Sequence, residues 1–477
     1  MELDKDLRAR QEARDLAQTA KQAQEQLADM SQEQLDKIVE AVAKAFSANA
    51  TLLAELAVRE TGFGNVSDKV EKNRFASLEV AKAVKDMKTV GFLKQVPGAR
   101  VWEVAVPVGV IAAIVPSTNP TSTVCYKAII SLKAGNAIVF SPHPKAIACT
   151  RKAAEIVAQA AEEAGAPAGS VGCLSIPSLE GCQELMHAEQ VRLILATGGP
   201  GMVKAAYSSG KPAIGVGAGN GPAYIHHSAD VARAMEQIAR SKTFDYGTVC
   251  ASEQSIIVEK NMESAVVEAG KRQGFYFMDS REAQSLAKLL FRPNGTLNPE
   301  IVGKAAPVLA EKAGFPVPGD TKVLVAREQE AGPTRPYSME KLCPVLAFFV
   351  MDSQEAVLQK CIQILQHEGS GHTFVIHAEE EAVIRQFARK IPVSRFLVNT
   401  PAALGGIGAS TGLFPALTLG CGAVGGSSSS NNISPMDLLN IRKVAWGERE
   451  NQKEKDPSVD SGLVELLTRK IMERLGE

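Results

Sequence analysis

A chain of 477 residues is long enough for two or three domains with buried cores. Hydrophobic residues make up 45% of it and charged residues 22%, and the formal net charge is −1. This balance argues against a disordered chain and against a basic surface for nucleic acid. The charged N-terminus lacks the apolar core of a secretory signal, and no uninterrupted apolar segment reaches bilayer length. We therefore expect small-molecule or protein partners, with no membrane and no nucleic acid.

The eight cysteines show no spacing typical of metal or disulfide chemistry. They form neither a CxxC pair nor a cluster of metal ligands, and they stand at positions 125, 149, 173, 182, 250, 343, 361 and 421. Scattered thiols of this kind favour a reducing cytoplasm over a disulfide framework. We expect a cytoplasmic protein without a metal site.

The N-terminal part is predicted to be helical. Residues 4–29 are rich in Ala, Gln, Glu, Lys and Arg and carry a weak apolar stripe, which is typical of a helix on the surface. Ser31 and Gln34 have the spacing of a capping box before an amphipathic helix that reaches Phe46. Another helix is expected from residue 52 to about residue 60, ending at Gly62.

The pattern changes to strands at Val101. Residues 101–106 alternate as in a half-exposed strand, and residues 108–115 are apolar on both faces, as in a buried strand. Repeated strand–helix units then predict a parallel, doubly wound sheet, with strands at 136–140, 171–176 and 191–196 and helices at 145–164, 179–189 and 202–208. Ligands bind such sheets beyond the carboxyl ends of the strands, so a cofactor cleft is expected at residues 116–120, 141–144 and 197–201.

A second strand–helix series follows a glycine-dense link over residues 212–221. The link lacks a GxGxxG fingerprint, because its glycines fall late in a strand pattern and precede no helix. By itself it is as compatible with an ordinary connection as with a domain hinge. Further strands are expected at 322–326, 345–350, 373–376 and 395–398. We expect a first domain over residues 1–222, with a projecting strand at 97–107, and a second domain over 223–424.

Three smaller segments complete the predicted organisation. Residues 425–447 contain an extended loop and an apolar stretch, which we interpret as an oligomerisation arm. Residues 448–461 are charged and contain proline, as expected of a flexible linker. Residues 462–477 place Leu463, Leu467 and Ile471 on one side of a helix, although Arg474 interrupts that side.

Cys250 carries the strongest functional signal. It follows a glycine-containing turn and precedes the apolar strand pattern of residues 254–258. Such a junction is rigid and faces a cleft, as a nucleophilic thiol requires, whereas a lone cysteine is more often a small buried hydrophobe. The segment Phe244–Glu253 resembles the catalytic-cysteine segment of the aldehyde dehydrogenase superfamily, and specifically its CoA-acylating branch. That branch includes microcompartment propionaldehyde and acetaldehyde dehydrogenases and the aldehyde dehydrogenase half of bifunctional aldehyde-alcohol dehydrogenases.

The resemblance extends to about residue 447 and implies an α/β fold with two doubly wound parallel-sheet domains and an oligomerisation strand. It implies NAD and coenzyme A as cofactors. In it, Asn119 of the segment Pro116–Pro120 donates to the oxyanion formed on Cys250, where an ordinary Asn-Pro turn is the alternative. Glu340 would hold the nicotinamide ribose. The cofactor-binding residues that follow are Pro116, Ser117, Thr118, Ser141, Pro142, His143, Thr197, Gly198, Gly199, Gly215, Val216, Gly217, Glu340 and Leu342.

Two departures from the hydrolytic aldehyde dehydrogenases are visible. The hydrolytic enzymes carry a water-activating Glu where this chain has Val216, and a Lys-Pro-Ser motif where this chain has residues 141–143. Water is therefore expected to be a poor acyl acceptor. His372 resembles a histidine of the acylating branch that would assist proton transfer from Cys250 or from the CoA thiol; a structural histidine at a strand start is the equal alternative.

The sequence leaves three functions to compare. An acylating dehydrogenase would convert a short aldehyde, NAD and CoA to acyl-CoA and NADH; a hydrolytic relative would release an acid; an inactive member would serve as a structural protein. The absence of a basic cluster near the motifs favours propionaldehyde or acetaldehyde over succinate semialdehyde or sulfoacetaldehyde. A homodimer or homotetramer is expected. The C-terminal helix resembles an encapsulation peptide, which implies microcompartment shell proteins as partners and the microcompartment lumen as location; packing on its own subunit or within the oligomer is the alternative.

Overall fold

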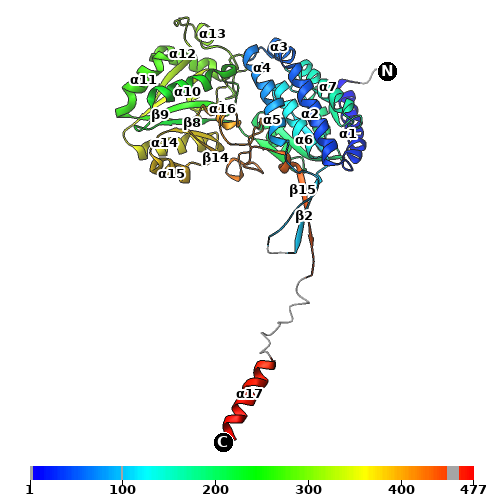
Figure 1. Ribbon diagram of the computed structural model, residues 1–477. Helices are drawn as coiled ribbons and strands as arrows, with labels where there is room; N and C mark the ends of the chain where they lie inside the picture. The colour runs from blue at the N-terminus through cyan, green and yellow to red at the C-terminus, as the bar shows by residue number, and fades with distance from the viewer. Residues whose placement is uncertain (1–3, 98–99, 448–460, 477) are drawn as a thin grey trace.

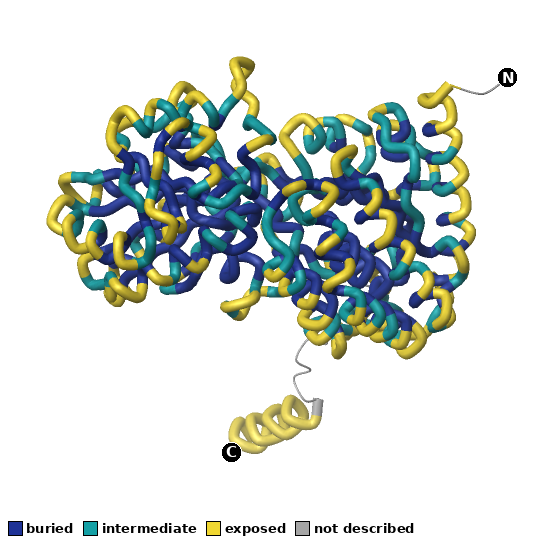
Figure 2. Tube along the Cα trace, turned by 90° about the horizontal axis from the view of Figure 1, so that it is seen from above, coloured by how far each residue is buried: buried dark blue, intermediate teal, exposed yellow. Residues whose placement is uncertain are grey.

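The computed structural model describes residues 4–97, 100–447 and 461–476. Two lobes, each built on a parallel sheet, lie side by side, and a narrow three-stranded sheet projects from them (Figure 1). The predicted α/β architecture with two doubly wound sheets and a projecting strand is confirmed. Buried segments fill the interior of both lobes (Figure 2).

The first lobe contains a five-stranded sheet in the order β5-β4-β3-β6-β7. All neighbouring strands are parallel, and β3 at the centre is buried along its whole length. The strands are β3 (Val110–Ile114), β4 (Ala137–Ser141), β5 (Val171–Cys173), β6 (Val191–Thr197) and β7 (Ala213–Val216). The connecting helices are α6 (Pro120–Lys133), α7 (Ile147–Glu163), α8 (Leu179–His187) and α9 (Pro200–Tyr207).

Helix α6 has no counterpart among the predicted elements. Every one of its residues is buried, including Lys127 and Lys133, so the sequence has no polar face and no amphipathic period. The lysines are accommodated because each ammonium meets oxygen atoms. Lys127 donates to the carbonyls of Ile114 and Leu195, at 2.8 and 2.9 Å, and Lys133 pairs with Asp36.

The N-terminal helices cover the first sheet. They are α1 (Lys5–Leu27), α2 (Gln32–Ala48), α3 (Ala50–Thr61), α4 (Val66–Arg74), the π-helix η1 (Phe75–Glu79) and α5 (Val80–Val84). The predicted capping box of Ser31 and Gln34 is formed. Within the described ranges no single helix is long and apolar enough to cross a membrane; α2 and α3 satisfy that test only together, with a bend of 62° between them.

The second lobe contains a seven-stranded parallel sheet in the order β10-β11-β12-β9-β8-β13-β14. Its strands are β8 (Gly221–Ile225), β9 (Glu253–Glu259), β10 (Phe275–Phe277), β11 (Val323–Glu328), β12 (Val345–Met351), β13 (Gly371–His377) and β14 (Val393–Val398). The expected domain boundary at residue 222 falls inside β8, so the change of sheet comes slightly earlier in the chain.

Helices and short turns connect the strands of this lobe. They are α10 (Val231–Thr243), η2 (Phe244–Gly247), η3 (Lys260–Met262), α11 (Glu263–Arg272), α12 (Ser280–Leu290), α13 (Ala306–Ala313), η4 (Pro336–Ser338), α14 (Gln354–His367), α15 (Glu381–Lys390) and α16 (Ala402–Gly406). Turn η2 contains two left-handed residues, Asp245 and Tyr246, with φ of 47° and 51°.

The projecting sheet joins distant parts of the chain in the order β1-β2-β15. Strands β1 (Gly91–Gln95) and β2 (Val101–Pro107) form an antiparallel hairpin, and β15 (Leu439–Ala445) pairs antiparallel with β2. The turns η5 (Ala423–Gly425) and η6 (Pro435–Leu438) precede β15. The strand expected at 97–107 therefore begins at Val101, and residues 98–99 lie outside the described residues.

Helix α17 (Ser461–Leu475) confirms that the C-terminal segment is helical. Its residues from 462 onward are exposed, including all of the large apolar ones (Figure 2). Most of the predicted linker, residues 448–460, lies outside the described residues.

Candidate active site

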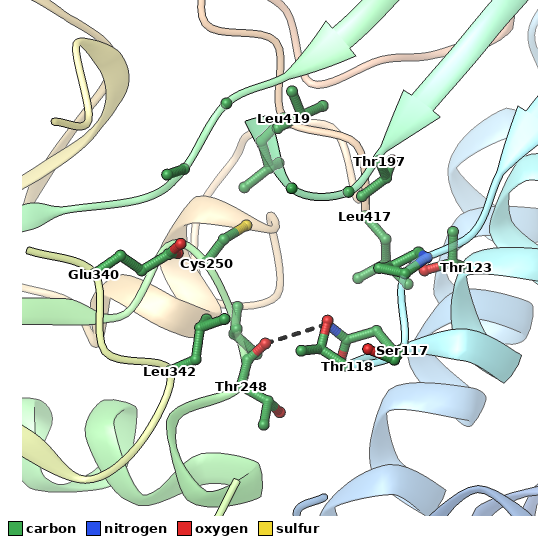
Figure 3. A pocket seen from close by; sticks show the side chains of 18 of the residues that line it. Ser117, Thr118, Thr123, Thr197, Thr248, Cys250, Glu340, Leu342, Leu417 and Leu419 are labelled. Carbon is green, nitrogen blue, oxygen red and sulfur yellow. Dashed lines mark hydrogen bonds between the residues drawn. The ribbon is translucent and has the colours of Figure 1, made fainter. Parts of the chain in front are cut away.

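A pocket between the two sheets gathers most of the predicted site residues. It is lined by the segment after β3, the ends of β6 and β7, the turn before β9, and residues from the C-terminal part of the second lobe. Cys250 and Glu340 lie on one wall, and Ser117, Thr118 and Thr197 lie on the opposite wall (Figure 3). The predicted residues in the lining are Pro116, Ser117, Thr118, Asn119, His143, Thr197, Gly198, Gly199, Val216, Gly217, Cys250, Glu340 and Leu342.

Cys250 stands in the turn between η2 and β9, as the sequence predicted, and part of its surface faces the pocket. Its backbone is tightly packed: a Cβ added at Gly219 would lie 1.8 Å from the Cys250 carbonyl oxygen, so the close approach of these two segments requires glycine. Burial, and then the Glu340 carboxyl, raise the pKa of the Cys250 thiol to about 12. The thiol is therefore protonated at neutral pH and must lose its proton before it attacks a carbonyl.

Asn119 immediately precedes helix α6 and lines the same pocket. Its Nδ2 atom lies 3.2 Å from the Thr248 carbonyl oxygen and 3.3 Å from Thr118 Oγ1. Its Oδ1 atom accepts a hydrogen bond from Lys72. The amide nitrogen and the Cys250 thiol thus belong to one cavity, as the oxyanion role of Asn119 requires.

Glu340 presents its carboxyl to the pocket near Cys250 (Figure 3). Its Oε1 atom accepts a hydrogen bond of 3.0 Å from the Gly219 amide. Burial, and then the neighbouring Glu368 carboxyl, raise its pKa to about 8. A carboxyl that is largely neutral at pH 7 can both donate and accept hydrogen bonds, as contact with ribose hydroxyls requires.

The cavity continues along the carboxyl ends of β3, β4 and β6. Ser141 and Pro142 line this second part together with His143, which also borders the Cys250 pocket. The His143 Nδ1 atom accepts from the Lys145 amide at 3.1 Å, and burial, followed by the Lys145 charge, lowers the pKa of the ring. The two cavities share lining residues at these strand ends, where the cofactor cleft is expected.

Gly215 and His372 are not among the residues that line these two cavities. A Cβ at Gly215 would lie 2.6 Å from Val203, so this glycine lets α9 pack closely on β7. His372 is buried at the start of β13 with its Nδ1 atom 2.9 Å from Thr373 Oγ1, and its Nε2 atom has no partner among the described residues. Burial and then Arg395 lower the pKa of His372 to about 3, so the ring is neutral at physiological pH.

Sequence reasoning missed two groups of residues around Cys250. Ile407, Leu417 and Leu419 supply an apolar part of the lining from an irregular stretch without periodicity. The second group, Lys69, Lys72 and Asp245, forms a buried cluster behind Asn119. Lysines of α4 and an aspartate of η2 are far apart in the sequence, so no local motif could associate them.

One trio of possible metal ligands occurs among the described residues, at His226, His227 and Glu380, whose ligand atoms lie within 4.8 Å of one another. Two of the three side chains are already in contact with one another, and His226 Nε2 has no partner among the described residues. His227 Nε2 lies 3.2 Å from Glu380 Oε1, and His226 Nδ1 accepts from the Ser228 amide at 3.2 Å.

The cleft between the two parallel sheets thus holds a thiol and an amide side chain, the two groups that covalent catalysis on a cysteine uses. The chain belongs to the aldehyde dehydrogenase family, whose model matches residues 6–273. It is 46% identical over 435 residues to the bifunctional aldehyde-alcohol dehydrogenase AdhE of Escherichia coli, covering 90% of this chain and 49% of AdhE. The chain therefore spans about half the length of this relative.

Solved structures agree with that assignment. An acetylating aldehyde dehydrogenase from Geobacillus thermoglucosidasius is 50% identical, with a TM-score of 0.92 and coverage of 94% of this chain and 100% of that one. A propionaldehyde dehydrogenase from the fucose utilisation microcompartment of Clostridium phytofermentans is 29% identical, with a TM-score of 0.82 and coverage of 90% and 96%. A propionaldehyde dehydrogenase of Rhodopseudomonas palustris, solved with CoA and an acylated cysteine, is 27% identical, with a TM-score of 0.82 and coverage of 91% and 97%.

Proposed function

We propose that the protein is a CoA-acylating aldehyde dehydrogenase, which converts an aldehyde, NAD and CoA to acyl-CoA and NADH through a thioester on Cys250. One observation carries this conclusion: the pocket combines Cys250 and Asn119 with Val216 at the position where hydrolytic relatives carry a water-activating carboxylate. The relatives that are named acetylating, and the one solved with an acylated cysteine, support it.

The residues fit this chemistry. The Cys250 sulfur adds to the aldehyde carbon, and the Asn119 amide donates to the oxygen that becomes negative. When bound, NAD accepts the hydride and CoA accepts the acyl group. The backbone near them is open, since a Cβ at Gly199 or Gly217 would meet no atom within 4 Å and one at Gly198 would meet only Met202. Glu340 is placed to bind hydroxyl groups. The resemblance assigns proton transfer to His372, but its buried ring lines neither cavity and its lowered pKa makes it a weak base, so the geometry adds no support for this role.

The test is the CoA dependence of NADH formation. Purified protein with a short aldehyde and NAD should form NADH rapidly only with CoA, and acyl-CoA should accumulate in equal amount. The Cys250→Ala variant should lose both signals. Equal rates with and without CoA, with release of the free acid, would instead identify a hydrolytic dehydrogenase.

The lining favours a small uncharged aldehyde such as propionaldehyde or acetaldehyde. No Lys or Arg occurs among the described residues that line the Cys250 pocket, and Ile407, Leu417 and Leu419 make part of it apolar. A carboxylate or sulfonate on the substrate would lose hydration without gaining a cation. A comparison of kcat/KM across propionaldehyde, acetaldehyde, succinate semialdehyde and sulfoacetaldehyde tests this choice, and a preference for either anion would overturn it.

The remaining proposal concerns location. All of the large apolar residues of α17, among them Leu463, Leu467 and Ile471, are exposed, and an isolated helix of this length is marginal in water. We propose that α17 docks on a microcompartment shell protein, as an encapsulation peptide does. One solved relative belongs to a microcompartment. Deletion of residues 462–477 should preserve kcat/KM and abolish co-purification with shells. Lost activity, or entry of the truncated enzyme into shells, would contradict this proposal.

A further inference from the structure

Lys72 reaches from helix α4 to the back of the active-site pocket. Its side chain is only 2% exposed. The ammonium donates to Asn119 Oδ1, forms an ion pair with Asp245 Oδ2, and lies 3.2 Å from Thr248 Oγ1. Three segments that are far apart in the sequence thus meet at one nitrogen atom, and one of them is the proposed oxyanion donor.

The contact determines which way the Asn119 amide points. An amide side chain has an accepting oxygen and a donating nitrogen of similar size, so its two orientations differ only in hydrogen bonding. An ammonium group can only donate. Lys72 therefore holds Oδ1, and Nδ2 is turned away from it toward the Thr248 carbonyl at 3.2 Å and Thr118 Oγ1 at 3.3 Å. Thr118 lines the pocket, so the N–H that donates to its hydroxyl lies at the pocket wall, where a substrate oxyanion would replace Thr118 Oγ1 as the acceptor.

Asp245 fixes Lys72 in turn. Its Oδ2 atom also accepts from Lys69 at 2.9 Å and from Thr248 Oγ1 at 2.6 Å, and its Oδ1 atom accepts from the Asn65 amide at 2.9 Å. Lys69 in addition donates to the Thr118 carbonyl at 3.0 Å. The two lysines therefore brace consecutive residues of the loop that carries the oxyanion donor.

We infer that Lys72 is a positioning residue, which orients the Asn119 amide for the carbonyl oxygen of the substrate. The inference rests on the proposed function for the role of Asn119. In this role Lys72 contacts neither the substrate nor Cys250, and it acts only through the Asn119 amide.

A double-mutant cycle on kcat for NADH formation tests this inference. Removing an oxyanion donor costs about 100-fold to 1,000-fold in kcat, so we expect Asn119→Ala to fall in that range and Lys72→Met to lose about 10-fold to 100-fold. KM for NAD and for CoA should change less than about twofold, because Lys72 makes no contact that would bind either molecule in the ground state. In the Asn119→Ala background, Lys72→Met should cost less than about threefold, since the amide on which it acts is gone.

Lys133→Met is the matched control. Lys133 is equally buried, lies at the far end of α6 and pairs with Asp36, so it reports the general effect of losing a buried ammonium. It should lower thermal stability and leave kcat unchanged. In Lys72→Met, Asp245 keeps its ion pair with Lys69, which favours a folded variant. If Lys72→Met is unfolded, Lys72→Leu, which also lacks a donor for Asn119 Oδ1, carries the same cycle.

The outcomes distinguish a failure of the Lys72 inference from a failure of the proposed function. If Lys72→Met lowers kcat by the same factor with and without the Asn119 amide, or changes only stability, Lys72 is structural and the inference is wrong. If Asn119→Ala is fully active, the oxyanion role fails and the inference fails with it. NADH formation is common to acylating and hydrolytic turnover, so a missing CoA dependence would overturn the proposed function and leave the cycle readable.

Discussion

Glu253 stands at the start of β9, three residues after Cys250, with its carboxyl in the protein interior. Its Oε1 atom accepts from the Ala402 amide at 2.9 Å, and Oε2 has no partner in the part of the chain that the structure describes. Burial raises the pKa of this carboxyl from 4.5 to about 7. Cys250 therefore lies just before a strand whose first residue changes charge near physiological pH.

This carboxyl predicts a pH dependence of stability. Because its folded pKa is raised, Glu253 contributes stability that is complete below about pH 4.5 and lost as the pH rises through about 7; the shift corresponds to about 3 kcal/mol. Glu253→Gln retains an acceptor for the Ala402 amide and cannot ionise. Its Tm should therefore fall less than that of the wild type between pH 5 and about pH 8. Glu236→Gln, at an exposed position, is the control, and parallel curves for all three proteins would contradict the prediction.

Some residues of the candidate site can be recognised from the sequence, and others cannot. Cys250, Asn119 and Glu340 stand in short motifs whose chemistry is local, and the structure gathers all three at one pocket. Lys72 and Asp245 are 173 residues apart, and their ion pair depends on the packing of α4 against η2. No composition or period encodes such a contact, so this part of the site could be found only in three dimensions.

At the scale of elements, the loop between α3 and α4 supports the cluster of Lys69, Lys72 and Asp245. Gly64 has φ of +72°, and a Cβ at this position would lie 1.8 Å from Asp245 Oδ1. Asp245 itself adopts a left-handed conformation that a non-glycine residue tolerates only under local constraint. Gly64 and Asp245 therefore pack against each other, and both have positive φ. The turn that leads to Cys250 thus depends on Gly64, a glycine of the first lobe.

Gly64→Ala should consequently impair catalysis as well as folding. The added methyl displaces Asp245 and, with it, the ion pair that holds Lys72, so we expect kcat to fall at least about tenfold, as misplacements of about 1 Å can cost 100-fold. Gly62→Ala provides the comparison, since Gly62 also has positive φ but its Cβ would meet only the flexible end of Lys304, at 3.3 Å. It should cost about 1 kcal/mol of stability and leave kcat unchanged. Equal kcat values for both variants would refute this coupling.

Two kinds of element could be predicted from the sequence: helices with one polar and one apolar face, and strands and helices that alternate regularly along the chain. The alternation of strands and helices gave both parallel sheets, and the apolar stripe of α2 gave its buried side. Helix α6 could not be recognised, because it is buried all round and its lysines are satisfied by carbonyl and carboxylate oxygens. The hairpin strand β1 was missed because its residues are largely exposed and show no buried face.

At the scale of the whole molecule, the projecting sheet leaves apolar side chains in solvent. Phe92, Trp102 and Val444 are 56%, 38% and 39% exposed, and the Phe92 and Trp102 rings pack edge to face at 5.2 Å. Both outer strands of the sheet, β1 and β15, have a free edge in the described chain. Such edges and faces are seldom left uncovered. We therefore propose that a second subunit covers this sheet.

A charge placed on this sheet should weaken the assembly. Val444→Lys adds an ammonium to an exposed apolar position without disturbing either lobe. Light scattering at micromolar concentration should give the mass of a dimer or larger oligomer for the wild type and a smaller mass for the variant. Ala232→Lys, at an exposed position of α10, adds the same single positive charge and is the control. A monomeric wild type, or an unchanged mass for Val444→Lys, would contradict the proposal.

Strand β2 can pair with β15 only after the ribosome has synthesised the residues between them. Glu103 and Lys443, which are bonded across these strands, are 340 residues apart. At about 5 to 20 residues per second, the ribosome needs roughly 20 to 70 seconds to pass from one to the other. During that interval the β1–β2 hairpin is without its third strand. We therefore expect subunits to associate after translation rather than on polysomes, because the sheet they would share is complete only after β15 has been synthesised.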